Sequence, residues 1–238
     1  MIDIPIEILE ELKTIKNVEG ILFTGSRAIG KAGKNSDWDF HILLADGAPR
    51  WRRTKKVGDT WIELFCNDRK QIETYFEEDL KEGTRAVTVF MFATGFVVHD
   101  NARNDLIKLV RHAKRIWEKG PKKLTKEDVG FINYDISGYL QDIEDGLVSH
   151  DPSPLICNYA VNEFVSYAFR LRGVWTPRPK DRLMELKKLD PEFYQTVERY
   201  LNEPDWERKA RIATELGLSL GKRFHLPLNG ELFLAPGR

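Results

Sequence analysis

Residues 20–44 read GILFTGSRAIGKAGKNSDWDFHILL, and this stretch decides the fold of the N-terminal half. An apolar run from Gly20 to Thr24 is followed by Gly25-Ser26 and by a segment long enough for one or two helical turns. A second apolar run begins at Asp37-Trp38-Asp39. The pattern predicts a strand, a tight turn and the start of a helix, and then a second strand that opens with two carboxylates.

Asp37 and Asp39 lie two positions apart at the start of the second predicted strand. Residues two apart on a strand project to the same side, ~6.5–7 Å apart, so both carboxylates face one pocket. Like charges held that close favour protonation unless a cation lies between them, and carboxylate oxygens suit Mg²⁺. We therefore predict that Asp37 and Asp39 are metal ligands. His41 shares their strand face and is expected to pack, partly buried, below the site.

A third acid is expected on a neighbouring strand. Glu63 lies within TWIELFC, residues 60–66, a run rich in β-forming residues where an unpaired carboxylate would be unfavourable. A short strand over residues 55–57 and a turn at 58–60 predict a hairpin that brings Glu63 beside the aspartates as a third metal ligand. Asp59 or Asp68 would serve instead if the strand were shifted by a few residues.

The Gly25-Ser26 turn has the composition of a phosphate-binding loop. Glycine lets the backbone approach a ligand closely, and a serine hydroxyl with free N–H groups at a helix N-terminus can hold phosphate oxygens. We predict that Gly25 and Ser26 bind the triphosphate of a nucleotide. Arg27 either touches the phosphates with them or faces solvent, and Lys34 and Asn35 are weaker candidates.

These motifs together resemble the DNA polymerase β-like nucleotidyltransferase superfamily. The residues that carry the resemblance are Gly25-Ser26-Arg27-Ala28-x-Gly30, Ser36-Asp37-x-Asp39 and an acid on a later strand, within residues 18–66. The pattern is most similar to the aminoglycoside (kanamycin-type) and the minimal nucleotidyltransferases. The resemblance implies an α+β fold, with a small mixed sheet and flanking helices that carry the site, followed by an all-α helical bundle.

Gly120-Pro121-Lys122-Lys123 interrupts the pattern and is the predicted domain boundary. It separates a nucleotidyltransferase catalytic domain, residues 1–120, from a C-terminal helical bundle domain, residues 121–238. The bundle begins with the capping-box pattern Thr125-x-x-Asp128. Beyond the elements named above, the sequence predicts a strand over 96–99 and helices over 5–16, 69–81, 101–119, from 125 to the break at 150–154, and over 155–172, 180–188, 191–201 and 204–224.

The helical half carries acids with a regular spacing. Asp128, Asp135 and Asp142 recur every seven residues and share one stripe, and Glu163 lies on the next predicted helix. This stripe is either a solvated face or an acidic wall that holds a cationic acceptor and supplies a general base. In the aminoglycoside enzymes that the pattern resembles, a helical-domain carboxylate has that role. Asp135 is our catalytic candidate, and Asp142 and Glu163 stay open as alternatives.

The bulk composition argues against several partners. Lys and Arg number 37, as do Asp and Glu, so no net positive field favours nucleic acid. The longest apolar stretch, residues 86–98, has 13 residues and falls short of the ~20 that span a membrane. The first seven residues carry acids where a signal peptide carries bases. We expect no membrane partner and a cytoplasmic location, and a homodimer is left open.

The resemblance implies an NTP-dependent and metal-dependent nucleotidyltransferase. A hydroxyl of an aminoglycoside-like small molecule would attack the α-phosphate of an NTP, with ATP favoured, while the three acids hold two Mg²⁺ and pyrophosphate leaves. One alternative is an antitoxin-type minimal nucleotidyltransferase that binds or nucleotidylates a protein partner, although such proteins usually consist of the catalytic half alone. A second is a binding module that has lost an acid, whereas this sequence keeps all three.

Overall fold

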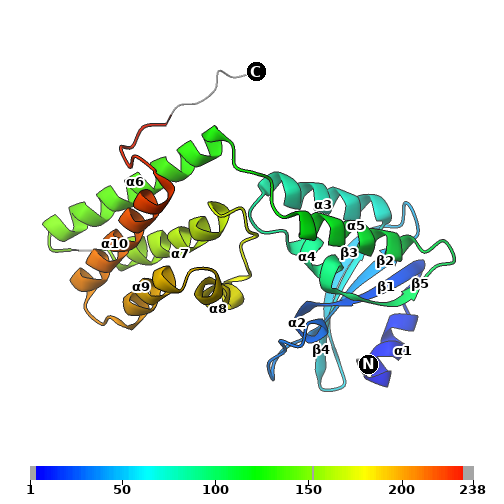
Figure 1. The fold of residues 1–238 in the computed structure, drawn as a ribbon. Coiled ribbons are helices and arrows are strands. Elements are labelled where there is room, and N and C mark those ends of the chain that lie inside the picture. Colours follow the sequence, from blue (N-terminus) through cyan, green and yellow to red (C-terminus); the bar gives the residue numbers. More distant parts are fainter. Residues whose placement is uncertain (1–3, 152, 233–238) are drawn as a thin grey trace. The chain divides into compact units, whose positions relative to one another are not determined.

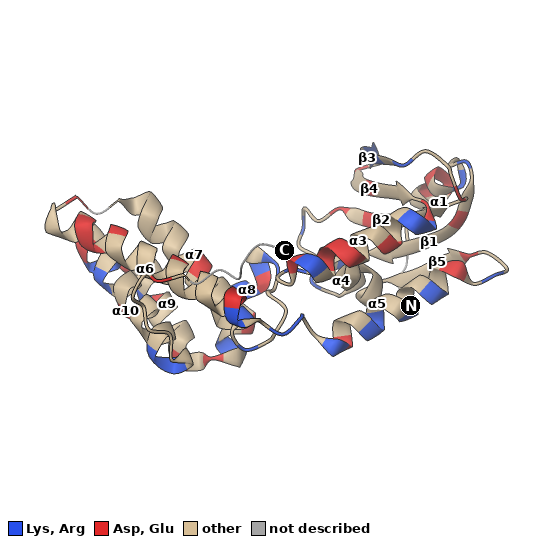
Figure 2. Ribbon diagram, turned by 90° about the horizontal axis from the view of Figure 1, so that it is seen from above, with Lys and Arg blue, Asp and Glu red and all other residues tan. Residues whose placement is uncertain are grey.

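A computed structural model describes residues 4–151 and 153–232, so the first three residues of the N-terminal segment discussed above lie outside it. The chain divides into two compact units, Met1–Gly120 and Pro121–Arg238. The first is mixed α and β, and the second is helical (Figure 1). No helix in the described ranges is both long enough and apolar enough to cross a membrane. Basic and acidic residues are interspersed along both units (Figure 2).

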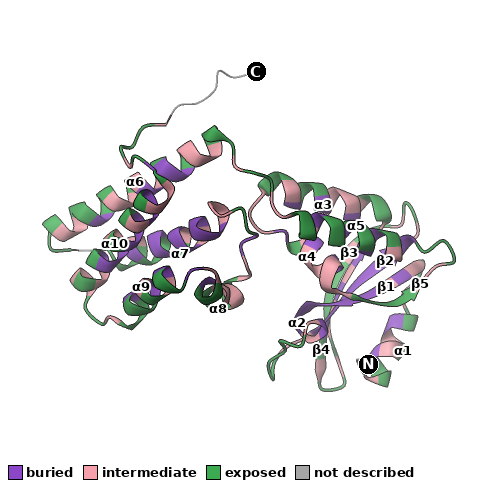
Figure 3. Cartoon of the chain, viewed as in Figure 1, coloured by how far each residue is buried: buried purple, intermediate pink, exposed green. Residues whose placement is uncertain are grey.

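The described strands of the first unit form one five-stranded mixed sheet, in the order β3-β4-β2-β1-β5. Strands β2 and β4 pair in parallel, whereas β1 with β2, β1 with β5 and β3 with β4 pair antiparallel. The central strand β2 is buried along its whole length (Figure 3). The strand bounds are β1 Val18–Thr24, β2 Trp38–Leu44, β3 Trp51–Val57, β4 Thr60–Asn67 and β5 Phe96–Asp100.

Helices cover both faces of this sheet (Figure 1). On one face, Ile8 and Leu12 of α1 pack in one apolar cluster with Phe23 of β1, Phe40 of β2 and Leu64 of β4. The opposite face is covered by α3, α4 and α5. Since side chains alternate along a strand, Asp39 and Glu63 point to this second face. The helix bounds are α1 Ile6–Lys13, α2 Gly25–Ala28, α3 Arg69–Glu82, α4 Val87–Thr94 and α5 Asp105–Lys119.

The second unit is a helical bundle with its own apolar core. Its first helix begins with the predicted capping box, because the Asp128 amide donates to Thr125 Oγ1 and the Thr125 amide donates to an Asp128 carboxylate oxygen. The buried Asp190 accepts hydrogen bonds from Arg172, Arg223 and the Phe193 amide, and so connects the turn at Arg172 with two helices. The bounds are α6 Lys126–Val148, α7 Pro154–Arg170, α8 Pro179–Leu189, α9 Pro191–Asn202 and α10 Trp206–Phe224.

Several element ends differ from the predicted ones for local reasons. Helix α1 stops at Lys13 and not at residue 16, and Asn17 then adopts a left-handed φ of 60°. Helix α5 starts at Asp105 and not at residue 101, because Asn104 is left-handed and the Asp100 carboxylate accepts the first free amides of the helix. Strand β3 is four residues longer at its start than predicted, beginning at Trp51 instead of residue 55.

Candidate active site

The three predicted acids lie together at one end of the sheet. Asp37 directly precedes β2, Asp39 is the second residue of β2, and Glu63 is its register partner on the parallel neighbour β4. One carboxylate oxygen from each residue lies within 4.8 Å of the others. Asp39 is buried, and Asp37 and Glu63 are partly exposed. Three converging carboxylates form a donor set that suits a hard divalent cation.

Position 25 of the turn requires glycine, because the backbone there lies against the carboxylate of Asp39. Gly25 follows β1, whose last residue Thr24 is the register partner of Asp39. Its φ is +77°, and a Cβ atom at this position would lie 1.8 Å from the Asp39 Oδ2 atom. Every other residue would therefore push the Asp39 carboxylate away. The sequence prediction assigned this glycine to a close approach of a ligand, and the neighbour found in the structure is Asp39.

Ser26 and Arg27 occupy the single turn of helix α2. Ser26 is buried beside Gly25. Arg27 donates from Nε to the carbonyl oxygens of Ser36 and Asp37, both at 3.1 Å, and its guanidinium lies 5.0 Å from the centre of the Trp38 ring. Arg27 thus holds the loop in front of Asp37, and phosphate binding by Gly25, Ser26 and Arg27 stays a prediction. Lys34 and Asn35 are exposed in that loop.

Glu63 has a partner that the sequence did not predict. Arg52 on β3 donates from Nε and Nη2 to Glu63 Oε1, at 2.8 and 2.5 Å, and its guanidinium lies 4.7 Å from the centre of the Phe65 ring. Thr54 is the register partner of Glu63, so Arg52 is a diagonal neighbour across the strand pair. The predicted strand started only at residue 55. A prediction that began this strand at Trp51 would have placed Arg52 beside Glu63.

His41 packs below the acids, as predicted, but it is buried and not partly exposed. It stacks on Phe65 with 4.7 Å between ring centres, and its Nε2 atom lies 3.4 Å from the sulfur of Met91. Burial and, to a lesser extent, the charge of Arg52 lower the pKa of His41 to about 3. The imidazole is therefore neutral at physiological pH, so it adds no charge beside the carboxylates.

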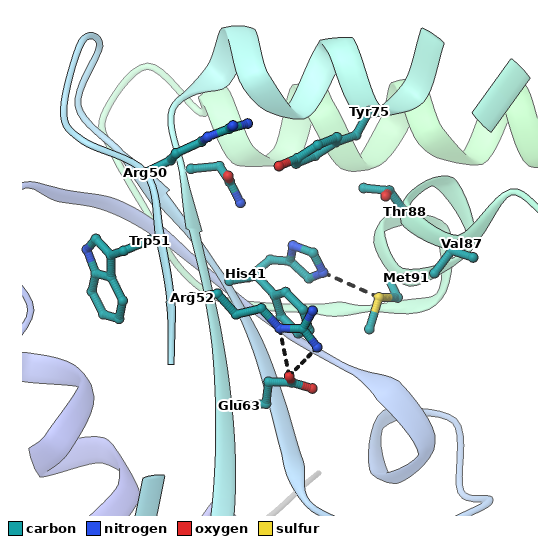
Figure 4. A pocket seen from close by; sticks show the side chains of 11 residues that line it. His41, Arg50, Trp51, Arg52, Glu63, Tyr75, Val87, Thr88 and Met91 are labelled. Carbon is teal, nitrogen blue, oxygen red and sulfur yellow. Dashed lines mark hydrogen bonds and ion pairs between the residues drawn. The ribbon is translucent and has the colours of Figure 1, made fainter. Parts of the chain in front are cut away.

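A cavity of about 590 Å³ lies on the same face of the sheet, next to Glu63. Strands β2, β3 and β4 and helices α3 and α4 contribute its lining (Figure 4). Figure 4 shows the Arg52–Glu63 pair at one side of it and Arg50 with Tyr75 at another. Its lining includes the buried residue Asn67, which no sequence pattern had indicated.

The acids of the second unit have different surroundings. Asp128 belongs to the capping box of α6, and Asp142 is exposed. Asp135 accepts a hydrogen bond from the Tyr167 hydroxyl at 2.7 Å. Burial, the neighbouring Tyr159 and the charges of Asp135 and Glu163 raise the pKa of Tyr139 to about 12. Asp135 and Glu163 thus act on the same tyrosine across α6 and α7.

The sequence matches the nucleotidyltransferase domain family over residues 6–133, more than half of the chain, and this span includes the turn and all three clustered acids. The chain belongs to this nucleotidyltransferase family. Membership supports NMP transfer in general and agrees with the polymerase β-like resemblance. The matched segment of the nucleotidyltransferase family continues past Gly120 into α6.

One solved structure similar to the chain is the crystal structure of a nucleotidyltransferase-like protein from Exiguobacterium sibiricum 255-15. The two chains have 12% sequence identity and a TM-score of 0.49, and the similarity covers 90% of this chain and 75% of that chain. A likeness of this degree assigns no function. Among curated proteins, no sequence matches the chain.

Proposed function

We propose that this protein transfers an NMP from an NTP to a hydroxyl of a small-molecule acceptor and releases pyrophosphate. The observation that carries the proposal is the cluster of Asp37, Asp39 and Glu63, with carboxylate oxygens within 4.8 Å of one another. The Gly25 backbone lies directly against this cluster. Carboxylates beside a phosphate-binding turn are what metal-assisted nucleotidyl transfer needs.

The three acids fit Mg²⁺ in ligand type and spacing. Oxygens that share one Mg²⁺ lie at most ~4.2 Å apart, so the observed separation needs only a small side-chain adjustment. In the proposal Asp37, Asp39 and Glu63 hold two Mg²⁺, and Glu63 exchanges Arg52 for the metal. Bound there, the ions would polarise the attacking hydroxyl and offset the charge that develops on the leaving pyrophosphate.

The transfer itself needs positioning and one proton acceptor. Gly25, Ser26 and the first amides of α2 would hold the triphosphate of the NTP, for which ATP is the proposed donor. The acceptor oxygen forms a bond to the α-phosphorus as the bond from that phosphorus to the bridging oxygen breaks, and the electron pair leaves with pyrophosphate. The hydroxyl proton goes to a carboxylate, for which we propose Asp135, with Asp142 and Glu163 as alternatives.

The proposed division of labour follows the two predicted domains. Residues 1–120 would bind the NTP and the metals, and residues 121–238 would contribute the base. The resemblance implies an aminoglycoside-like acceptor, and the acids near Tyr139 would attract its amines. A protein hydroxyl is the alternative acceptor, as in the antitoxin-type minimal nucleotidyltransferases.

A direct test incubates the full chain with each of the four NTPs, Mg²⁺ and a panel of hydroxyl-bearing acceptors, and measures pyrophosphate. We expect pyrophosphate only when NTP, metal and a suitable acceptor are all present. Asp39→Asn should remove it. Asp59→Asn is a matched control, because Asp59 is fully exposed in the hairpin turn. Equal pyrophosphate release by the Asp39→Asn variant and the wild type would contradict the proposal.

A further inference from the structure

The cavity next to Glu63 lies on the β4 side of Asp39, away from the Gly25 turn. The sheet order places β1 and β4 on opposite sides of β2, so the Gly25 turn and Glu63 flank Asp39. In phosphoryl transfer the attacking and leaving oxygens lie roughly in line on opposite sides of the phosphorus. If the turn holds the leaving pyrophosphate, the hydroxyl enters from the β4 side, where the cavity lies.

The cavity contains polar groups that no protein group satisfies. Asn67 is only 7% exposed, yet its side-chain amide has no hydrogen-bond partner among the described residues. The hydroxyls of Tyr75 and Thr88 also line the cavity without a partner in the described part of the chain. The polar atoms of the Asn67 amide are open to the cavity, where water or a ligand can satisfy them. These three side chains therefore provide hydrogen-bonding sites for a bound molecule.

The charged groups around the cavity are predominantly basic. Arg50 and Arg52 line it, and Glu63 is the only acid in the lining formed by the described residues. Arg50 donates to the neutral amide of Gln71, at 3.0 Å. Arg52 neutralises Glu63 in the absence of metal. The neutral His41 adds no further charge to the lining.

Metal binding would change this balance. A cation held by Glu63 would take the place of the Arg52 guanidinium, which lies over the Phe65 ring beside the cavity. Arg50 and Arg52 would then both face the cavity without an acidic partner from its lining. The cavity suits a carboxylate or a phosphate group, because it combines two guanidinium groups with hydrogen-bonding side chains from β4 and α3.

Building on the nucleotidyl transfer proposed above, we propose that this cavity receives the acceptor, and that the acceptor is a small hydroxyl compound with an anionic carboxylate or phosphate group. Arg50 and Arg52 hold the anionic group, and Asn67 and Tyr75 bind polar groups of the remainder. A polycationic acceptor would place like charges against both arginines. Among the small-molecule acceptors of the proposed transfer, the site therefore favours anionic hydroxyl compounds over the aminoglycoside-like ones that the family resemblance implies.

A binding experiment without turnover tests the anion site. Inorganic phosphate is titrated by calorimetry into the full chain in the presence of Mg²⁺ and an NTP analogue. The analogue has a methylene bridge between the α- and β-phosphorus, so it cannot react. Its triphosphate already occupies the Gly25 turn when phosphate is added. Arg50→Gln and Arg52→Gln should each weaken phosphate binding about tenfold or more. Arg53→Gln is the matched control on the same strand, because its guanidinium lies over Trp51, 5.2 Å from the ring centre, and does not line the cavity. Equal phosphate affinity in all three variants and the wild type overturns the proposal.

A second measurement tests the acceptor class. Pyrophosphate release is compared for three matched sets of hydroxyl compounds: hydroxy acids and sugar phosphates, neutral sugars, and amino sugars. We expect release with members of the anionic set, and comparison of its two halves distinguishes carboxylate from phosphate. Release with amino sugars alone overturns the anionic acceptor but leaves the nucleotidyl transfer intact. Failure of the transfer itself would appear separately, as no pyrophosphate from any of the three sets, while the phosphate titration with the analogue bound still decides the anion site.

Discussion

Gly25 and Asp39 are separated by fourteen positions in the sequence but touch in the fold. A Cβ atom at position 25 would overlap the Asp39 carboxylate, so Gly25→Ala should weaken Mn²⁺ binding as well as lower stability. Gly47→Ala is a matched control, because Gly47 has the same φ of +77° with nothing within 4 Å of the added atom. Each variant should lose about 1–2 kcal/mol from the left-handed backbone alone. Metal titration and thermal unfolding measure the two effects, and equal Mn²⁺ affinity in both variants would contradict the coupling.

The clustered carboxylates should be indispensable for both transfer and metal binding. Asp37→Asn and Asp39→Asn should abolish transfer and metal binding while the fold is retained, because each removes a proposed ligand charge from the cluster. Removing one of several like charges should leave the metal-free variants at least as heat-stable as the wild type. Pyrophosphate release, Mn²⁺ titration and circular dichroism measure the three quantities. Wild-type turnover in either variant would show that its side chain holds no metal.

The neutral His41 predicts an acid-sensitive stability. Its pKa is lowered to about 3 in the fold but is ~6.5 in an unfolded chain, so between these values the unfolded state binds more protons. The free energy of unfolding is therefore undiminished above pH 6.5 and falls as the pH drops, by up to ~2 kcal/mol between pH 6.5 and 5. Urea unfolding of His41→Gln should show a shallower dependence on pH. The same pH dependence in the variant and the wild type would show that His41 does not cause it.

Among the strands and helices, the sequence predicted those with a strong local signal. Strand β2 is an apolar run, and the capping box of α6 is a local motif, and both were found as predicted. Strand β3 was only partly predicted, because Arg52, Arg53 and Thr54 are polar and an edge strand tolerates polar side chains on exposed positions. That omission hid the partner of Glu63. The unpaired amide of Asn67 depends on tertiary packing, which periodicity does not encode.

Helix α4 illustrates an element that depends on a distant residue. Its own N-cap, Ala86, offers no side-chain acceptor, and the buried Asp79 of α3 accepts the Val89 amide at 2.8 Å instead. Asp79→Ala should therefore destabilise the protein by about 1–3 kcal/mol, since it leaves buried amides without a partner. Chemical denaturation measures this loss. Glu78→Ala, at an exposed neighbour on α3, should change stability by less than ~0.5 kcal/mol; equal losses in the two variants would mean that Asp79 does not cap α4.

The helical unit is proposed to supply the general base of the transfer. If it supplies the general base, neutralising the right carboxylate should lower the rate roughly 10²–10⁴-fold without changing NTP or metal affinity. Asp135→Asn, Asp142→Asn and Glu163→Gln should be compared for transfer and, separately, for NTP binding. Asp128→Asn is expected to lower stability instead, because Asp128 caps α6. Full activity in the first three variants would leave the base to another group.

The parallel register of β2 and β4 limits which misassembled forms of the chain can accumulate. Asp39 lies opposite Glu63, and the adjacent Phe40 and Leu64 fill the apolar layer under α1. A slip of one residue in β4 would turn Glu63 into that layer and expel Leu64 from it. The mispaired chain would lose its core and its acid cluster together. Folded but wrongly assembled molecules are therefore not expected to accumulate, and the active fraction of a preparation should equal its folded fraction.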